Sequence, residues 1–477
     1  MDEISPLSTE DLGLPRLAVI APAGFGKTEF IASIVVDDEG SPLVLTHTNA
    51  GVSALRKRVA SKSGGKRHPG RISTIAGWCE AWVTAYPSVS DYSDFCEEKA
   101  ERQDTYYRHL YEAMLKLLKT PWTRRSLRST YSRLIVDEYQ DCTNLQHKIV
   151  LAVSEFLPVL VLGDPMQGIF YWVKGDSPIR WDAIAMPLRT LDGKPWRWTN
   201  SGHQGLGEYI GSVRTGLLPT LSGSDVTIDL STPCRDVILM RSEDLQKLRP
   251  SGTCSVAYLT TVKGIQYGFS QSHWGFQSNE PVDGQEAESF CTLVDTLEGA
   301  SLALSAIGFL KECFTKVGSE LSAYIKHLEK GNFDFRQVRK KRTIGDTIGS
   351  LEHDSSSGAV LRLLREVYKD SSTFRLHRGV LFWEVCRALE RASSDGVAAK
   401  DALQSMRSWG RAHEDYMRYK AISSRTVLSK GLEYDVAVVD VMRMKDPRDF
   451  YVAISRCKKR LVLVTDASVI TFKGLKD

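Results

Sequence analysis

The strongest chemical signal in this sequence of 477 residues is a glycine-rich segment near its beginning. An apolar run at 17–20 is followed by Ala-Pro-Ala-Gly-Phe-Gly-Lys-Thr, which ends on Lys27 and Thr28. The run predicts a buried strand, and the residues that follow predict a helix. Gly24 and Gly26 let the backbone curl so that its N–H groups face a polyphosphate, at the positive end of the helix dipole. We therefore predict a phosphate-binding loop in which Lys27 contacts the β- and γ-phosphates and Thr28 ligates Mg²⁺.

Two further segments place polar groups directly after apolar runs. Residues 134–136 lead into Asp137 and Glu138, and residues 159–162 lead towards Gln167. Because ligands bind at the carboxyl ends of strands in a parallel sheet, we expect these side chains at one edge of a sheet. Asp137 suits Mg²⁺, Glu138 suits the base that activates the attacking water, and Gln167 is placed to reach a γ-phosphate.

Each of these segments also has a simpler interpretation. The first departs from the pattern GxxxxGK(S/T), because Ala21 occupies the place of the first glycine, and it is compatible with an ordinary turn that contains a lysine. The other two are compatible with a solvated acidic turn and a plain turn. Three strand-to-loop junctions with phosphate-compatible tips in one chain favour the joint interpretation, an α/β protein of the P-loop NTPase class.

The order of these motifs resembles that of the UvrD/Rep branch of superfamily 1 helicases. DEYQD at 137–141 is close to the family's DExQD, and GDPMQGIF at 163–170 is similar to its GDxxQSIY. Further segments resemble motif Ia, motif Ib, KGLEFD and YVAxTRA; they are 45–50 with 53–58, 73–78, 429–435 and 451–458. The matches follow the family order from residue 17 to residue 465.

The resemblance implies two RecA-like domains with parallel sheets and ATP held in the cleft between them. On this basis Arg456 corresponds to the arginine finger, and Arg197 to a second contact of the γ-phosphate. Trp196 takes the place of the aromatic ring that stacks on the base, and Glu433 that of the residue that hydrogen-bonds the ribose. For each of these four residues a purely structural role is the alternative.

The chain departs from the family pattern in three places. No glutamine occurs within residues 1–27, where the family has one that contacts adenine. Val427 stands near the place of the histidine before KGLE, and Ala76 replaces the histidine of motif Ib. The choice between ATP, other NTPs and dNTPs therefore stays open, and the expectation of vigorous unwinding is weakened more than that of hydrolysis.

Aromatic and hydroxyl side chains within the motifs are candidates for contacts with DNA. By the resemblance, Phe170 and Trp172 stack on bases, and a position in the core is their alternative. Thr48, Asn49 and Thr74 are expected to contact the DNA backbone. Because every base has a face on which an aromatic ring can stack, we expect sequence-tolerant binding of single-stranded DNA, or of DNA with single-stranded ends.

The charge of the chain gives weaker evidence on nucleic acid. The formal net charge is only +4, so DNA binding does not follow from composition. A basic stretch follows the motif Ia segment, with Lys or Arg at positions 56, 57, 58, 62, 66, 67 and 71. Contact with phosphates and a solvated charged helix face explain this stretch equally well.

Length and apolar periodicity predict several domains. We expect a first motor domain at 15–195, with a short helical insertion at about 80–130 in the place of subdomain 1B. The second motor domain is split into 196–265 and 418–477, around a mainly helical, 2B-like insertion at 266–417. Within that insertion the sequence predicts helices at 300–314 and 360–368 and loops at 354–358 and 393–396.

Composition also bears on the compartment. The nine cysteines never form a CxxC pair, which argues against a zinc ribbon or a disulfide framework and favours a reducing cytoplasm. No apolar run approaches the ~18 residues that a membrane span needs. The start Met-Asp-Glu has neither a basic nor an apolar region typical of a signal peptide. We expect a cytoplasmic protein without a membrane partner.

Two functions follow from the resemblance. The first is a DNA-stimulated ATPase that moves 3′→5′ along single-stranded DNA as a translocase or helicase. The second is a regulatory, DNA-sensing NTPase subunit that controls a partner nuclease. In size and motif set the chain is also similar to the small UvrD-like subunit of the Gabija anti-phage system, which works with an OLD-type nuclease and would place the protein in antiviral defence.

Overall fold

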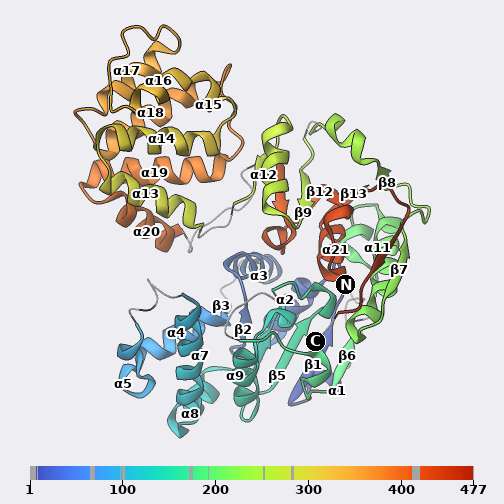
Figure 1. Cartoon of the computed structure of the whole chain (residues 1–477). Coiled ribbons are helices and arrows are strands. Elements are labelled where there is room, and N and C mark those ends of the chain that lie inside the picture. The colour runs from blue at the N-terminus through green and yellow to red at the C-terminus, as the bar shows by residue number, and fades with distance from the viewer. Residues whose placement is uncertain are drawn as a thin grey trace. The chain divides into compact units, whose positions relative to one another are not determined.

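Figure 1 shows a computed structural model of the chain, which describes residues 7, 9–64, 70–96, 98, 103–170, 176–191, 193–250, 253–280, 284–410 and 419–475. The chain divides into two compact units. The first unit consists of Met1–Leu239, Lys430–Asp435 and Met444–Asp477, and the second of Met240–Ser429 and Val436–Arg443. The predicted domain boundaries are not decided by this division and stay a prediction.

The first unit is built on a six-stranded sheet of order β3-β2-β4-β5-β1-β6. Its strands are β1 Arg16–Ile20, β2 Leu43–Thr46, β3 Arg71–Thr74, β4 Leu134–Val136, β5 Val159–Gly163 and β6 Leu188–Thr190. All neighbouring strands in this sheet are parallel, with registers such as Leu17↔Leu160 and Leu45↔Val136. The tips of β1, β2, β3, β4 and β5 therefore meet at one edge, as the sequence predicts.

Helices cover both faces of this sheet, because successive residues of each strand point to opposite sides. Leu43, Leu45 and Val136 pack in one core with α4 Ile75–Ala85, α7 Gln103–Leu118 and α9 Asn144–Ser154. Val44 and Ile135 pack in the other core with α2 Lys27–Asp37 and α3 Asn49–Lys62. The remaining α-helices among the described residues of this unit are α1 Thr9–Leu12, α5 Pro87–Ser90, α8 Pro121–Thr130, α10 Trp196–Thr199, α11 Gln204–Leu217 and α21 Pro447–Ile454.

A second six-stranded sheet has the order β10-β11-β9-β12-β13-β8. Its strands are β8 Val237–Met240, β9 Val256–Thr260, β10 Gln277–Ser278, β11 Ala421–Arg425, β12 Tyr434–Asp440 and β13 Cys457–Val464. The pairs β10–β11, β11–β9 and β9–β12 are parallel. An antiparallel pair joins β7 Val226–Asp229 to β14 Val469–Phe472. The expected fold class, α/β with two parallel sheets and many helices, is confirmed.

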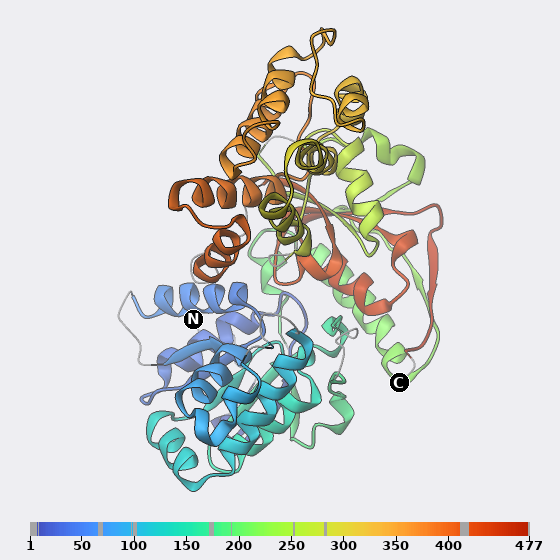
Figure 2. The ribbon, with the colours of Figure 1, turned by 60° about the vertical axis from the view of Figure 1, so that its left-hand side comes forward.

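The second unit contains α12 Lys263–Ser272 and a helical cluster, coloured yellow to orange in Figures 1 and 2. Its helices are α13 Gln285–Thr296, α14 Gly299–Cys313, α15 Val317–Glu320, α16 Ser322–Leu328, α17 Arg342–Ser350, α18 Ser357–Lys369, α19 Gly379–Asp395 and α20 Ala399–Gly410. They share one continuous apolar core. No helix among the described residues has the length and apolar character needed to cross a membrane.

The helices predicted at 300–314 and 360–368 are confirmed as α14 and α18, but the two predicted loops are partly wrong. Ser356 accepts a hydrogen bond from the N–H of Ala359 and starts α18 inside the segment 354–358. At 393–396, α19 continues to Asp395 and ends only at Gly396, whose φ is 67°. Serines favour both loops and helix ends, and here they belong to the ends of α18 and α19.

Candidate nucleotide-binding site

The glycine-rich loop connects β1 to α2 in the first unit. Gly24 and Gly26 have φ values of 78° and 85°, in the left-handed region that glycine adopts without steric penalty. A Cβ atom on Gly24 would lie 2.5 Å from the ring of Trp198, so a larger residue does not fit there. The ammonium of Lys27 donates to the carbonyl oxygen of Ala21 at 2.9 Å, which places it over the loop. The predicted phosphate loop thus has the required backbone shape.

The two carboxylates follow β4 at the same edge of the sheet. Asp137 is 5% exposed and accepts a hydrogen bond from the N–H of Glu138 at 2.9 Å. Glu138 has a φ of 55°, which is uncommon for a residue with a side chain. The surrounding contacts must hold this backbone in place, as is found at sites where a side chain is aimed at a ligand.

The surroundings of the two carboxylates shift their pKa values in opposite directions. Burial alone would raise the pKa of Glu138, but the ammonium groups of Lys27 and Lys430 lower it to about 2. Burial and the neighbouring Glu138 raise the pKa of Asp137 to about 7, against the effect of Lys27. Glu138 is therefore ionised at neutral pH and can orient and deprotonate water. A cation beside Asp137 would stabilise its charged form.

Gln140 holds the Glu138 side chain and was missed from the sequence as a site residue. Its Nε2 donates to Oε2 of Glu138, and its Oε1 accepts from the N–H of Asp164 at 2.9 Å. A Cβ atom on Gly163 would lie 2.4 Å from this Oε1, so the close approach requires glycine at that position. The DExQD spacing, in which the glutamine follows the acid by two positions, is the signal that could have identified it.

Gln167 lies between an acid and an arginine. Its Nε2 donates to Oδ2 of Asp164 at 3.2 Å, and its Oε1 accepts from Nη2 of Arg456 at 3.4 Å. Gln167 and Asp164 are 3% and 0% exposed. The residue predicted to contact the γ-phosphate and the predicted arginine finger therefore meet in the first unit.

Arg456 is a buried cation, with 3% exposure. Its guanidinium donates to the carbonyl oxygen of Val452 at 3.0 Å and to the hydroxyl of Ser455 at 2.8 Å. Burial, with the neighbouring Arg197, lowers the pKa of Arg456 to about 10. No salt bridge joins Arg456 to a carboxylate in the described part of the chain. Such a buried cation favours an incoming anion.

Arg197 and Glu433, predicted for opposite ends of the nucleotide, contact each other. Nη2 of Arg197 lies 2.6 Å from Oε1 of Glu433, and Nη1 donates to the carbonyl oxygen of Ser455 at 2.5 Å. The N–H of Arg197 donates to the carbonyl oxygen of Gly24 at 3.1 Å, which fixes α10 on the phosphate loop. The roles in γ-phosphate and ribose binding stay predictions.

Trp196 and Thr28 also lie at the loop. Cδ1 of Trp196 is 3.5 Å from the place that a Cβ atom on Gly26 would take, so the indole borders the loop. Thr28 is the second residue of α2 and is half-buried. Their roles towards the base and Mg²⁺ stay predictions.

The residues present fit a triphosphate with a divalent cation. Lys27 and the buried Arg456 supply positive charge for phosphate oxygens. The raised pKa of Asp137 indicates that too little positive charge lies beside this carboxylate to balance its ionised form. Within the described ranges, no group of three or more His, Cys, Asp or Glu residues could hold a metal ion by itself. Mg²⁺ would thus depend on Asp137, Thr28 and the phosphates together, as is usual for Mg²⁺ with nucleotides.

Two further residues of the site were not singled out from the sequence. Lys430 donates to both carboxylate oxygens of Asp141 and to the carbonyl oxygen of Gln167 at 2.6 Å. The hydroxyl of Tyr451 accepts from the N–H of Ala23 in the phosphate loop at 3.0 Å. Lys430 belongs to the segment that resembles KGLEFD, and Tyr451 to the segment that resembles YVAxTRA. Their places in these motifs are the signal that could have identified them.

The hydroxyls predicted to contact the DNA backbone cap two helices. Oγ1 of Thr48 accepts from the N–H of Gly51 at 3.1 Å, and Oγ1 of Thr74 accepts from the N–H of Gly77 at 3.0 Å. Asn49 is exposed at the start of α3. Because β2 and β3 are neighbours, the amino termini of α3 and α4 lie side by side, where their dipoles favour an anion.

Of the two predicted base-stacking rings, the structure describes one. Phe170 is half-buried, and the ammonium of Lys430 lies 5.1 Å from its ring centroid. Trp172 lies outside the described residues. The Phe170 ring is therefore connected to the nucleotide site through Lys430, which also contacts Gln167.

Three residues of the basic stretch after the motif Ia segment form contacts within the protein. Arg56 donates to the carbonyl oxygen of Ile72 at 2.9 Å. Arg58 and Lys62 both pair with Glu29, at 3.1 Å and 2.7 Å. These contacts favour the structural interpretation for the three residues, while positions 66 and 67 lie outside the described residues.

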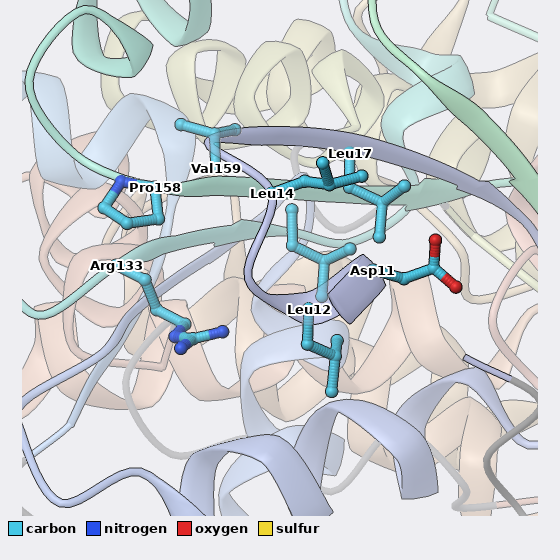
Figure 3. A pocket seen from close by; sticks show the side chains of 8 residues that line it. Asp11, Leu12, Leu14, Leu17, Arg133, Pro158 and Val159 are labelled. Atoms are coloured by element: carbon cyan, nitrogen blue, oxygen red, sulfur yellow. The ribbon is translucent and has the colours of Figure 1, made fainter. Parts of the chain in front are cut away.

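A small pocket lies at the other edge of the first sheet, away from the predicted site (Figure 3). Leu14, Arg133 and Pro158, which precede β1, β4 and β5, line it together with Asp11, Leu12, Leu17, Val159 and Leu160. Arg133 pairs with Asp38 at 2.9 Å. None of the predicted site residues lines this pocket.

The phosphate loop, the paired carboxylates and the parallel α/β sheet are the features of a P-loop nucleotide-binding fold. Residues 85–181 match the family model of the UvrD/REP helicase N-terminal domain. This segment contains Asp137, Glu138 and Gln167, and the resemblance to UvrD-like superfamily 1 helicases is confirmed by the match.

No curated protein matches the chain. Among solved structures, the Pif1 helicase from Candida albicans is aligned over 97% of this chain and 96% of its own, at 12% sequence identity and a TM-score of 0.37. That likeness is too distant to carry a functional conclusion.

Proposed function

We propose that the chain hydrolyses ATP with Mg²⁺ and uses the reaction to move 3′→5′ along single-stranded DNA as a translocase or helicase. One observation carries the hydrolysis. Gln140 links Glu138 to Asp164, and Asp164 binds Gln167, whose Oε1 accepts from Nη2 of Arg456 at 3.4 Å, so residues far apart in the sequence meet at one place. An ionised base, two cations and a glutamine at one place are the groups that phosphoryl transfer to water needs.

Each side chain has a role that follows from its contacts. Lys27, at the mouth of the phosphate loop, would bind the β- and γ-phosphates, and Glu138, fixed by Gln140, would accept the proton of the attacking water. Arg456 would stabilise the charge on the transferred phosphoryl group, and Gln167 would contact the same group. Mg²⁺, held by Asp137 and Thr28, would neutralise phosphate charge.

The route from hydrolysis to DNA runs through the segment after β5. Gln167 and Phe170 are three positions apart, and Lys430 contacts the carbonyl oxygen of the first and the ring of the second. A shift of Gln167 on loss of the γ-phosphate would therefore be transmitted to the Phe170 ring. A ring stacked on a base is the element by which such a shift would move the strand.

The test is turnover of ATP, GTP and dNTPs with and without single-stranded DNA. We expect hydrolysis that rises with DNA of any sequence, and displacement of an annealed strand from a duplex with a 3′ overhang but not from one with a 5′ overhang. Absence of hydrolysis with every nucleotide would refute the proposal. Displacement from the 5′ overhang would refute only the direction.

A regulatory NTPase that controls a partner nuclease is the second candidate, because the chain lacks features linked to unwinding. Val427 stands near the place of a family histidine, and no glutamine precedes the phosphate loop within residues 1–27. This function predicts hydrolysis without strand displacement. It also predicts that a nuclease co-purifies in stoichiometric amount from the native host.

A further inference from the structure

We infer that Arg214, which lies outside every recognised motif, is a positioning residue for the hydrolysis proposed above. It acts through Asp164 on Gln167 and on the Gln140–Glu138 pair. The inference rests on the proposed function, because it assigns a role within that same site. It adds a residue of α11, a helix to which the sequence assigned no chemistry.

The contact between Arg214 and Asp164 is bidentate and buried. Nη2 of Arg214 donates to Oδ1 of Asp164 at 2.7 Å, and Nε donates to Oδ2 at 3.2 Å. Their side chains are 11% and 0% exposed. A planar guanidinium that donates two hydrogen bonds fixes both the place and the orientation of a carboxylate, whereas an ammonium fixes only its place.

The Asp164 carboxylate, held in this way, orients the side chain of Gln167. Its Oδ1 accepts from the N–H of Met166 at 3.2 Å, and its Oδ2 accepts from Nε2 of Gln167 at 3.2 Å. The Gln167 amide is thereby turned so that Oε1 faces the Arg456 guanidinium. If the Asp164 carboxylate rotates, it no longer holds the Gln167 amide in one orientation, and the contact of Gln167 with Arg456 changes.

The backbone N–H of Asp164 also orients the proposed base, Glu138, through Gln140. This N–H donates to Oε1 of Gln140 at 2.9 Å, and Nε2 of Gln140 donates to Glu138. An amide that is held at its oxygen presents its nitrogen in one direction. Arg214 thus supports both the base and the γ-phosphate contact, although it touches neither.

A second arm leads from Arg214 to the phosphate loop. The guanidinium carbon of Arg214 lies 6.0 Å from the ring centroid of Tyr451, and the hydroxyl of Tyr451 accepts from the N–H of Ala23. A cation at this distance from an aromatic face is attracted to it. Both arms end on groups that would contact the triphosphate, which distinguishes Arg214 from an ordinary buried ion pair.

The test uses Arg214→Lys in the full chain, because lysine retains the charge and loses the second hydrogen bond. We expect kcat for ATP to fall by roughly ten- to hundredfold, the size of effect known for a small misplacement of catalytic groups. KM for ATP and the midpoint of urea unfolding should stay close to the wild-type values. Arg124→Lys is the matched control, since Arg124 forms a surface pair with Glu155 at 2.9 Å, and its kcat should not change.

A binding measurement gives a readout that does not need turnover. Because Gln167 is the γ-phosphate contact, the wild type should bind ATPγS more tightly than ADP, and Arg214→Lys should reduce this preference several-fold while affinity for ADP stays unchanged. The neutral pair Arg214→Met with Asp164→Asn removes both charges and should show the same loss. It serves in place of Arg214→Lys if that variant does not fold.

The possible results distinguish a failure of the role inferred for Arg214 from a failure of the proposed hydrolysis. Wild-type protein that neither hydrolyses nor binds a triphosphate would overturn both. Wild-type turnover with an equally active Arg214→Lys and an unchanged ATPγS preference would overturn the inference alone. A variant in which ADP affinity and the unfolding midpoint fall together with kcat would also overturn it, because Arg214 would then only stabilise the fold.

Discussion

The ammonium of Lys430 lies 2.5 Å from each carboxylate oxygen of Asp141, although 289 positions separate the two residues in the sequence. The side chains are 9% and 3% exposed, so the pair is removed from water. The same ammonium donates to the carbonyl oxygen of Gln167 at 2.6 Å. This contact fixes the KGLEY segment on the two segments that follow β4 and β5.

Loss of one partner of this pair should destabilise the first unit. Lys430→Met leaves the buried Asp141 carboxylate without its cation, which costs about 3–5 kcal/mol. Adding Asp141→Leu removes the second charge and should recover most of that loss. Urea unfolding followed by circular dichroism gives the comparison. Lys116→Met, which breaks an exposed pair with Asp91, should cost less than about 1 kcal/mol. Equal losses for the two single variants would contradict the role given to burial.

The phosphate loop and the base are tested by Lys27→Ala and Glu138→Gln. Both should abolish hydrolysis, because the first removes the phosphate contact and the second removes the base. Glu138→Gln should still bind nucleotide, which a fluorescent ATP analogue would report. Lys148→Ala and Glu155→Gln, exposed residues of α9 and its end, are the controls and should keep normal turnover. Normal turnover in Lys27→Ala or Glu138→Gln refutes the assigned roles.

Arg456 should contribute to catalysis more than to binding. Arg456→Ala is expected to lower kcat by a factor on the order of 10³ or more, as for other arginine fingers. The initial rate of phosphate release at saturating ATP measures this. Arg460→Ala, an exposed arginine on β13, is the control. A drop of only about tenfold would be too small for a finger and would favour the structural alternative.

His47 should contribute stability to the first unit that is lost as the medium becomes acidic, whereas the raised pKa of Asp137 acts in the opposite direction over the same pH range. Burial, followed by the nearby Lys430 and opposed by Glu138, lowers the pKa of His47 to about 4 from 6.5. Between these values His47 binds a proton in the unfolded chain but not in the folded chain, so the contribution of His47 to stability rises with pH across this window and is lost as the pH falls through it. The contribution is about 1–3 kcal/mol.

Between pH 6.5 and pH 4, the unfolding free energy of His47→Gln should increase relative to that of the wild type, as measured by urea titrations of both proteins across the range given by the two pKa values. His353→Gln is the control, because the His353 side chain is 84% exposed. An identical pH dependence in His47→Gln and wild type would show that the His47 ring is solvated rather than buried.

Local patterns in the sequence predicted the parts of the site that lie on one continuous segment. The phosphate loop and the Asp137–Glu138 pair could be predicted, because an apolar strand and the polar residues after it are adjacent in the chain. The roles predicted for Arg456 and Arg197 rest on the resemblance alone, since their motifs lie far from the loop. Neither the local patterns nor the resemblance predicted the contact of Arg197 with Glu433, because each of these two residues was assigned a contact with the nucleotide.

Arg214 and Lys430 show why the rest of the site was not predicted. Each forms a buried pair with an acid from another segment, Asp164 and Asp141. A helix with one arginine looks the same in sequence whether that side chain is solvated or buried. Only the folded sheet, which brings the ends of β4 and β5 together, decides which cations become buried beside them.

The link between nucleotide and DNA is tested at Phe170. Phe170→Ala removes a ring that would stack on a base, and such a loss costs about 1–3 kcal/mol, which is roughly 5- to 150-fold in affinity for single-stranded DNA. Stimulation of hydrolysis by DNA should fall with it, whereas turnover without DNA should change little if Lys430 keeps its bond to Asp141. Trp172→Ala should act in the same direction. Anisotropy of a labelled oligonucleotide, with Tyr107→Ala as a control for loss of a half-exposed ring elsewhere in the first unit, measures the affinity. An unchanged DNA response in both variants would place the two rings in the core and would leave hydrolysis without a described route to the strand.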